Sequence, residues 1–268
     1  MRFEISSDLR FEFTKENIDI YLKELGKEYR RQRGKGMPAE LILIGGASVL
    51  INYGFRNMTT DVDAVIQAAS GMKDAINAVR DRYGLPNHWL NDDFKNTSSY
   101  TPKLIEFSVY YKTFSNVLSI RTIASEYLIA MKLRSGRQYK SDLSDVLGIL
   151  AEHEKEGTPL SMKQIRKAVT DLYGDWNSLP NASQVFIENV MENSGFEQLY
   201  EQITREEQET KELLIQLEEN YPGIITRANV NGIAENLQEK ADRASILARL
   251  RQKKSVDTKI TDEKKSGG

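Results

Sequence analysis

The sequence has no cysteine and only two histidines, His88 and His153, among its 268 residues. Without cysteine there are no disulfides, no thiolate zinc sites and no cysteine nucleophiles, and two histidines argue against a histidine-rich metal centre. No apolar run approaches the ~18–20 residues that span a membrane. The first 13 residues also lack the hydrophobic segment of a secretory signal. We therefore expect a cytoplasmic protein.

Neither sign of charge dominates the chain. Lys and Arg number 37, Asp and Glu number 39, and the formal net charge is -2. No global field attracts nucleic acid or a membrane surface, so a site for a polyanion has to be a local patch. The length is sufficient for one large domain or two smaller ones with a sizeable core.

The most informative stretch runs from Leu41 to Ile66 and reads LILIGGASVLINYGFRNMTTDVDAVI. Residues 41–44 form a short apolar run that ends in a glycine pair, which favours a strand. Residues 47–52 follow with one or two helical turns, and residues 61–66 indicate a second strand. A glycine pair before a helix allows close backbone approach to a phosphate, at a helix end that favours negative charge.

Asp61 and Asp63 alternate with apolar residues in the second of these strands. Side chains two apart along a strand lie on the same face, about 7 Å from one another. Two such carboxylates repel unless a cation neutralises them, and Mg²⁺ is commonly held by one or two carboxylates together with substrate phosphates. The alternative is a buried strand–turn–strand in which the aspartates only close a turn.

Three groups of residues in this stretch carry a family resemblance: Gly45-Gly46, then Gly54-Phe55-Arg56, then Thr60-Asp61-Val62-Asp63. In order and spacing they resemble the glycine-pair and DxD signature of minimal nucleotidyltransferases of the polymerase-β-like superfamily. Within it they are most similar to the AbiEii-type enzymes of abortive-infection and toxin–antitoxin systems. The resemblance implies that Asp61 and Asp63 hold Mg²⁺ and that Gly45, Gly46 and Ser48 bind phosphate oxygens.

A third carboxylate is expected on a later strand. Residues 103–111 read KLIEFSVYY, which predicts a strand rich in aromatic and β-branched residues with Glu106 in its middle. A carboxylate there is costly unless it is paired or liganded. The resemblance makes Glu106 the candidate for the third metal ligand, although the family more often has Asp at that position. The alternative is an edge strand on which Glu106 faces water.

A second motif lies between Ile123 and Leu150, where the pattern predicts a helix, a break at Gly136 and a second helix. The charged residues on this helix–break–helix are Lys132, Arg137, Lys140, Asp142 and Asp145. By the same resemblance, Lys132 contacts nucleotide phosphate, and Asp142 or Asp145 orients or ion-pairs the basic groups around Arg137. The alternative is ordinary surface pairing at helical spacing, worth only tenths of a kcal/mol.

The rest of the chain reads as mostly helical. Periodicity and capping residues predict helices over residues 15–32, 70–83, 163–172, 182–192, 196–220 and 231–253. Thr14, Ser70, Ser125 and Ser161 are candidate caps. The loop containing His88 and Trp89 is either a packing anchor or a base-stacking site. The cluster Lys27, Arg30, Arg31, Arg33 and Lys35 is either a solvated helix end or a nucleic-acid patch.

The predicted fold class is therefore α/β (α+β): a small mixed sheet with flanking helices, followed by a helical bundle. We expect a catalytic domain over residues 1–155, a helical domain over 156–254 and a disordered tail over 255–268. The resemblance implies Mg²⁺-dependent transfer of NMP from an NTP to an acceptor hydroxyl. It further implies a tRNA acceptor, a toxin or phage-defence role and a cognate antitoxin. The alternatives are a nucleotidyltransferase fold that only binds nucleotide or a partner, and an enzyme that modifies hydroxylated antibiotics.

Overall fold

The computed structural model describes residues 11–68, 70–137, 140–192, 195–226 and 229–237. The chain divides into two compact units. The larger comprises Glu4–Arg137 and Ser141–Arg205, and the smaller contains Glu206–Gly268. All the residues predicted to form the site belong to the larger unit.

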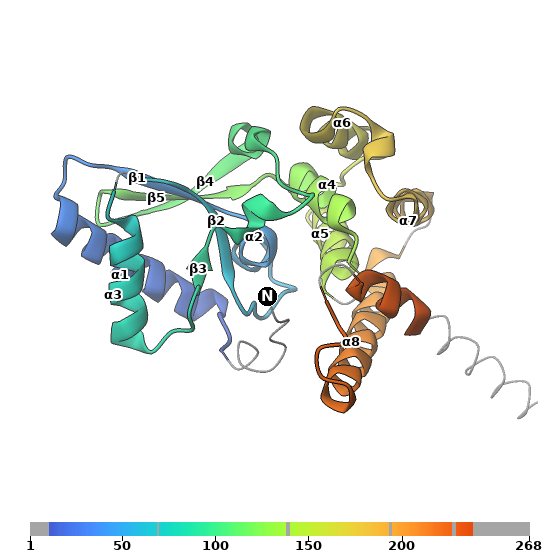
Figure 1. The fold of residues 1–268 in the computed structure, drawn as a ribbon. Helices are drawn as coiled ribbons and strands as arrows, with labels where there is room; N and C mark the ends of the chain where they lie inside the picture. Colours follow the sequence, from blue (N-terminus) through green and yellow to red (C-terminus); the bar gives the residue numbers. More distant parts are fainter. Residues whose placement is uncertain (1–10, 69, 138–139, 193–194, 227–228, 238–268) are drawn as a thin grey trace, which may run out of the picture. The chain divides into compact units, whose positions relative to one another are not determined.

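One five-stranded mixed sheet organises the larger unit, which confirms the predicted α/β class (Figure 1). Its spatial order is β3-β2-β1-β5-β4. The strands are β1 (Ala39–Leu43), β2 (Val62–Gln67), β3 (Leu90–Asn91), β4 (Ser108–Phe114) and β5 (Leu118–Ile123). The β1–β2 and β4–β5 pairs are antiparallel, whereas β1–β5 and β2–β3 are parallel. The strand–glycine–helix–strand order predicted from residues 41–66 is the observed order of β1, α2 (Gly45–Asn52) and β2.

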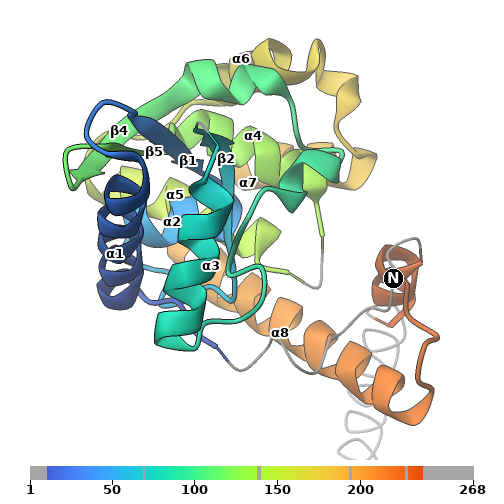
Figure 2. The ribbon, with the colours of Figure 1, turned by 60° about the vertical axis from the view of Figure 1, so that its left-hand side comes forward.

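Each face of the sheet packs on its own helices. On one face, Leu41 and Leu43 join the core formed with α1 (Lys15–Arg33) and α3 (Met72–Tyr83). Figures 1 and 2 show these two helices side by side on that face. On the other face, Ile42 and Val65 join the core of the later helices. Those helices are α4 (Ser125–Ser135), α5 (Asp142–Lys155), α6 (Met162–Tyr173), α7 (Asn181–Glu192) and the start of α8 (Phe196–Asn220).

Capping residues set several of the predicted helix ends. Thr14 and Ser161 each form a capping box, at the starts of α1 and α6. Gly84 and Gly136 end α3 and α4 in the left-handed conformation that glycine adopts most easily. Two predicted caps are wrong. Gly71, rather than Ser70, precedes α3, and Ser125 is the first residue of α4 after the cap Ala124.

The strand predicted over residues 103–111 is wrong in its first half. Pro102–Phe107 forms a 3₁₀ helix, η3, and β4 begins only at Ser108. Thr101 accepts a hydrogen bond from the backbone N–H of Lys103, and Pro102 occupies the first turn, where its missing N–H costs nothing. Residues three apart share a face of a 3₁₀ helix, so Leu104 and Phe107 both reach the core, where Phe107 stacks on Tyr127.

Residues 230–237 are helical, which confirms the first part of the helix predicted over residues 231–253. The remainder of that predicted helix and the tail predicted over 255–268 lie outside the described residues.

Candidate active site

The site is built where β1 passes into α2. Gly45 has φ +56°, a backbone conformation that side chains with a Cβ rarely adopt. A Cβ placed on Gly45 would lie 3.8 Å from Oδ2 of Asp63, and the backbone N–H of Ile44 donates to the carbonyl of Asp63 at 3.0 Å. The start of α2 therefore lies against the carboxylate of Asp63.

Asp61 and Asp63 are both half-buried. Asp63 lies in β2, and alternation along the strand places it on the same sheet face as Val65, which belongs to the α4–α7 core. Asp61 immediately precedes the strand, and its backbone carbonyl accepts a hydrogen bond from the Thr59 hydroxyl at 3.2 Å. The Asp63 carboxylate thus lies beside the start of α2, and both carboxylates have partial access to water. Carboxylates of this kind are ligands that Mg²⁺ shares with substrate phosphates, and the role of Asp61 and Asp63 as metal ligands stays a prediction.

Arg56 lies on the other side of the glycine pair. A Cβ placed on Gly46 would stand 3.0 Å from Arg56 Nη2 and 2.6 Å from Thr59 Oγ1, so only glycine fits there without displacing these groups. Arg56 Nε donates to the carbonyl of Met58 at 3.0 Å. Its Nη1 lies 2.6 Å from both carboxylate oxygens of Asp145 on α5.

Asp145 is one member of a buried charge network, which consists of Arg56, Lys132, Arg137, Asp142 and Asp145. Lys132 Nζ lies 2.9 Å from Asp142 Oδ1 and 2.7 Å from Asp145 Oδ2. Arg137 Nε lies 2.8 Å from Asp142 Oδ2. The exposed fraction of the side chain is 8% for Lys132, 0% for Asp142 and 3% for Asp145, so the surface-pairing alternative is wrong for these three residues.

Lys132 and Asp142 stabilise one another's charged forms. Burial by itself lowers the pKa of Lys132, but the attraction of Asp142 and Asp145 outweighs it, and the pKa of the ammonium group is raised. Burial likewise opposes ionisation of Asp142, yet Lys132 and Arg137 hold the pKa of that carboxyl far below its usual range. Three cations and two carboxylates thus make up the contacts of this network described above, and Arg56 is the cation that lies against Gly46 at the start of α2.

The other predicted site residues are placed as follows. Ser48 is completely buried, and its hydroxyl accepts a hydrogen bond from the backbone N–H of Ile123 at 3.1 Å. Its role in phosphate binding stays a prediction. Asp142 and Asp145 are ion-paired to basic groups, whereas the contact of Lys132 with nucleotide phosphate also stays a prediction.

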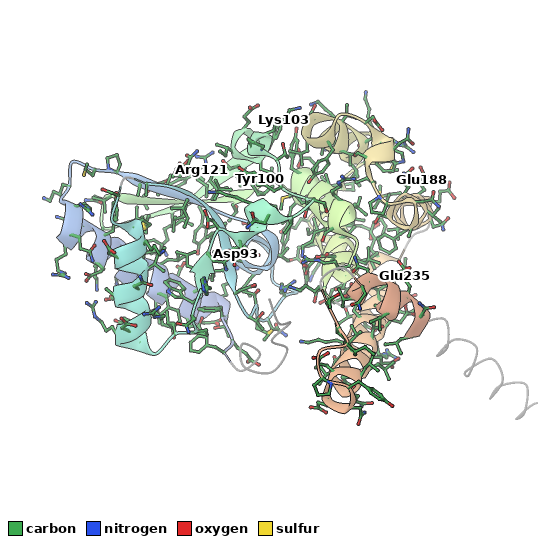
Figure 3. The ribbon with its side chains drawn as sticks, viewed as in Figure 1. Asp93, Tyr100, Lys103, Arg121, Glu188 and Glu235 are labelled. Carbon is green, nitrogen blue, oxygen red and sulfur yellow. The ribbon has the colours of Figure 1, made fainter. Side chains whose placement is uncertain are left out.

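Glu106 does not occupy the middle of a strand. It is an exposed residue of η3, the short helix that also carries Lys103 at its outer surface (Figure 3). In the described part of the chain, no three histidine, aspartate or glutamate side chains gather closely enough to hold a metal ion. The costly mid-strand carboxylate that made Glu106 a candidate is therefore absent, and its role as third ligand stays a prediction.

Two neighbours of the predicted site had no role assigned from the sequence. Arg56 lies inside the resembling motif, and an arginine five residues before Asp61 is the signal that could have indicated it. Asn91 on β3 stands opposite Asp63 in the parallel register of β2 and β3. The Asn91 side chain bonds the carbonyl of His88 and the backbone N–H of Asp93, so it stabilises the turn beside the site. Asp93 itself is exposed.

Two features with a proposed role in nucleic-acid binding have structural explanations. Trp89 is 1% exposed, stacks on Phe13 and donates to the carbonyl of Ile76, so it is a packing anchor. At the basic end of α1, Arg31 binds the buried Glu28, which is also bound by Arg82 of α3. Arg30 donates to the carbonyl of Ser115. These contacts favour the helix-end interpretation.

Over the residues that the structure covers, none of the helices combines the length and the apolar character that crossing a membrane requires.

Comparison with known proteins gives one match. No curated protein and no solved structure matches the chain. A family model does match, over residues 21–154, and this stretch contains the glycine pair, both aspartates of the DxD motif and the whole charge network. The matched stretch starts within α1 and ends near the end of α5, and it amounts to half of the sequence. The chain belongs to the family described as nucleotidyltransferase of unknown function (DUF6036).

Proposed function

We propose that this protein is an Mg²⁺-dependent nucleotidyltransferase that transfers NMP from an NTP to an acceptor hydroxyl. The observation that carries the proposal is the placement of the Asp63 carboxylate against Gly45 at the start of α2, with Asp61 two residues away. Membership of a nucleotidyltransferase family supports the same chemistry. The catalytic part is proposed to lie within residues 1–155, and the helical part, residues 156–254, would bind the acceptor or a partner.

In the proposed reaction the acceptor oxygen forms a bond to the α-phosphorus, the bond from that phosphorus to the bridging oxygen breaks, and pyrophosphate leaves. Bound Mg²⁺ would supply charge neutralisation for the triphosphate and the leaving group. Asp61 and Asp63 would hold the metal, and the carboxylates or water would take up the proton of the hydroxyl. The backbone at Gly45 and Gly46 would approach phosphate oxygens at the start of α2. The protein's contribution is then mainly positioning and electrostatics.

The acceptor that we propose is a tRNA end, and the role is that of a toxin or phage-defence component in the cytoplasm with a cognate antitoxin protein. These points rest on the resemblance of the Gly45-Gly46 and Asp61-Val62-Asp63 motifs to AbiEii-type enzymes. Arg134 and Arg166 would supply positive charge toward an RNA backbone. Their guanidinium groups lie over the half-buried rings of Tyr173 and Trp176, at 5.7 Å and 4.2 Å.

The test is transfer of label from each α-labelled NTP to total tRNA, in Mg²⁺, by the full chain. We expect D61N and D63N each to lower transfer by at least about 100-fold, because each removes a ligand of the proposed metal. D92N is the matched control, since the Asp92 side chain is 52% exposed and pairs with Lys95. Unchanged transfer by both D61N and D63N would refute the proposal. E106Q is assayed beside them, and a loss equal to that of D61N would make Glu106 the third ligand.

A second candidate is a module of the same fold that binds nucleotide or a partner without chemistry. One observation favours it: no third carboxylate gathers with Asp61 and Asp63 among the described residues. This candidate predicts Mg²⁺-dependent NTP binding, measured by calorimetry, together with no transfer to tRNA, protein or small-molecule hydroxyls.

A further inference from the structure

The three nitrogens of the Arg56 guanidinium have different surroundings. Nε donates a hydrogen bond to the carbonyl of Met58, and Nη1 donates to the carboxylate of Asp145. Nη2 is the nitrogen that lies against Gly46, and no acceptor in the described part of the chain binds it. The Nη2 amino group of the Arg56 guanidinium therefore lies at the start of α2, where it can donate hydrogen bonds to a ligand.

Asp145 is what fixes that fork. Both of its carboxylate oxygens lie 2.6 Å from Arg56 Nη1, and its Oδ2 also lies 2.7 Å from Lys132 Nζ. An arginine held at two nitrogens by acceptors has little freedom left in its planar group. The direction of Nη2 is therefore determined by a residue 89 positions away in sequence.

The other two cations of the network are both bound to Asp142, although the Arg137 side chain is 32% exposed. Lys132 is flanked by two carboxylates within hydrogen-bonding distance and is only 8% exposed. Arg137 binds Asp142 through its backbone N–H and its side chain. Arg56 is 18% exposed and is the member of the network that touches the glycine pair. A phosphate group at the start of α2 would therefore meet Arg56 before it meets Lys132.

We propose that Arg56 binds the β- or γ-phosphate of the nucleoside triphosphate through Nη2, with Asp145 as the positioning residue that aims it. This inference rests on the proposed function and deepens it, because it makes the site selective for triphosphates over monophosphates. A guanidinium can bind Asp145 through one nitrogen and a phosphate oxygen through another. Lysine has a single ammonium nitrogen, which cannot lie beside Asp145 and beside the phosphate in the same way.

The test measures binding of each NTP and of the corresponding NMP, in Mg²⁺, to the full chain by calorimetry. R56K keeps a cation beside the buried Asp145, so it preserves the fold better than a neutral residue would. We expect R56K to weaken NTP binding by about 10–100-fold, the effect of losing one charge-assisted hydrogen bond. NMP binding should change by less than about twofold. R80K is the matched control, because Arg80 pairs with Asp81 on α3, away from the glycine pair.

Asp145 is tested by D145N and by the double variant R56K/D145N. If Asp145 acts through Arg56, D145N weakens NTP binding and the double variant is no weaker than the worse single variant. Additive losses would refute the positioning role. Far-UV circular dichroism and urea unfolding show whether each variant is folded. If D145N does not fold, the comparison of NTP binding by R56K and R80K still tests the contact of Arg56 with the phosphate.

The outcomes separate this inference from the proposed function. Wild-type protein that binds NTP and transfers NMP, while R56K behaves in the same way, refutes the role of Arg56 alone. Equal weakening of NTP and NMP by R56K also refutes it, since the lost contact would then not be to the β- or γ-phosphate. Wild-type protein that binds no NTP refutes the proposed function itself.

Discussion

Lys132 Nζ lies 2.9 Å from Asp142 Oδ1, and both side chains are almost completely removed from water. The two residues come from different helices, α4 and α5, on either side of the break at Gly136. A buried ion pair adds little net stability compared with a well-packed apolar pair, but the loss of one partner leaves a charge buried without compensation. The pair therefore fixes how α4 and α5 meet.

Loss of the Asp142 carboxylate should destabilise the protein strongly. We expect D142A to lower the free energy of unfolding by about 3–5 kcal/mol, because Lys132 and Arg137 lose a shared partner. The measurement is urea unfolding at pH 7, with D92N as the exposed control. The double variant K132M/D142L should lose less than the sum of the single changes, since it removes both charges. A loss below about 1 kcal/mol for D142A would contradict this role.

Stability should fall in acid, and Glu28 and Asp142 are two of the carboxyl groups responsible. Hydrogen bonds from Arg31, aided by Gln32 and Arg82 and opposed by burial, lower the pKa of Glu28 from 4.5 to about 2. The pKa of Asp142 is lowered as well. The unfolded chain therefore binds more protons than the folded one in this range. The stability contributed by each group is complete above its unfolded-state pKa and is lost as the pH falls toward its folded-state pKa.

The corresponding measurement is the free energy of unfolding between pH 7 and pH 2. For Glu28 the loss begins below about pH 4.5 and continues toward pH 2. E28Q removes this titration, so its stability should vary less with pH over that window than that of the wild type. Equal slopes for the two proteins would contradict the assignment. Lys132, whose pKa is raised, contributes stability that is lost only in strong alkali.

Local patterns predicted the elements that carry the site, because the glycine pair, the apolar runs and the alternation around Asp61 and Asp63 are short-range signals. The error at residues 103–107 is also local: Thr101 and Pro102 favour a turn, and Leu104 and Phe107, three residues apart, share a face of a 3₁₀ helix but would lie on opposite faces of a strand. Arg56 is different. Its partner Asp145 is 89 residues away, and sequence spacing contains no information about a contact at that separation.

The variant G46A tests the geometry at the start of α2, because it adds a Cβ to a position with no room for one. A Cβ there would stand 2.6 Å from Thr59 Oγ1 and 3.0 Å from Arg56 Nη2, so one of these groups has to move in G46A. Overpacking of this kind costs about 1–3 kcal/mol of stability. Because Arg56 is held at Nε and Nη1, a shift also turns Nη2 away from the site, and we expect NTP binding to weaken by about tenfold.

The matched control for G46A is G36A, because a Cβ on Gly36 meets no atom within 4 Å. Its stability should stay within about 0.5 kcal/mol of the wild type, as for other unobstructed surface positions. Urea unfolding and NTP calorimetry are measured on both variants. If G46A binds NTP as tightly as G36A does, the space beside Gly46 is not where the phosphate lies. The proposed contact of Arg56 with the triphosphate would then fail together with the glycine-pair assignment, since both require a phosphate at that point.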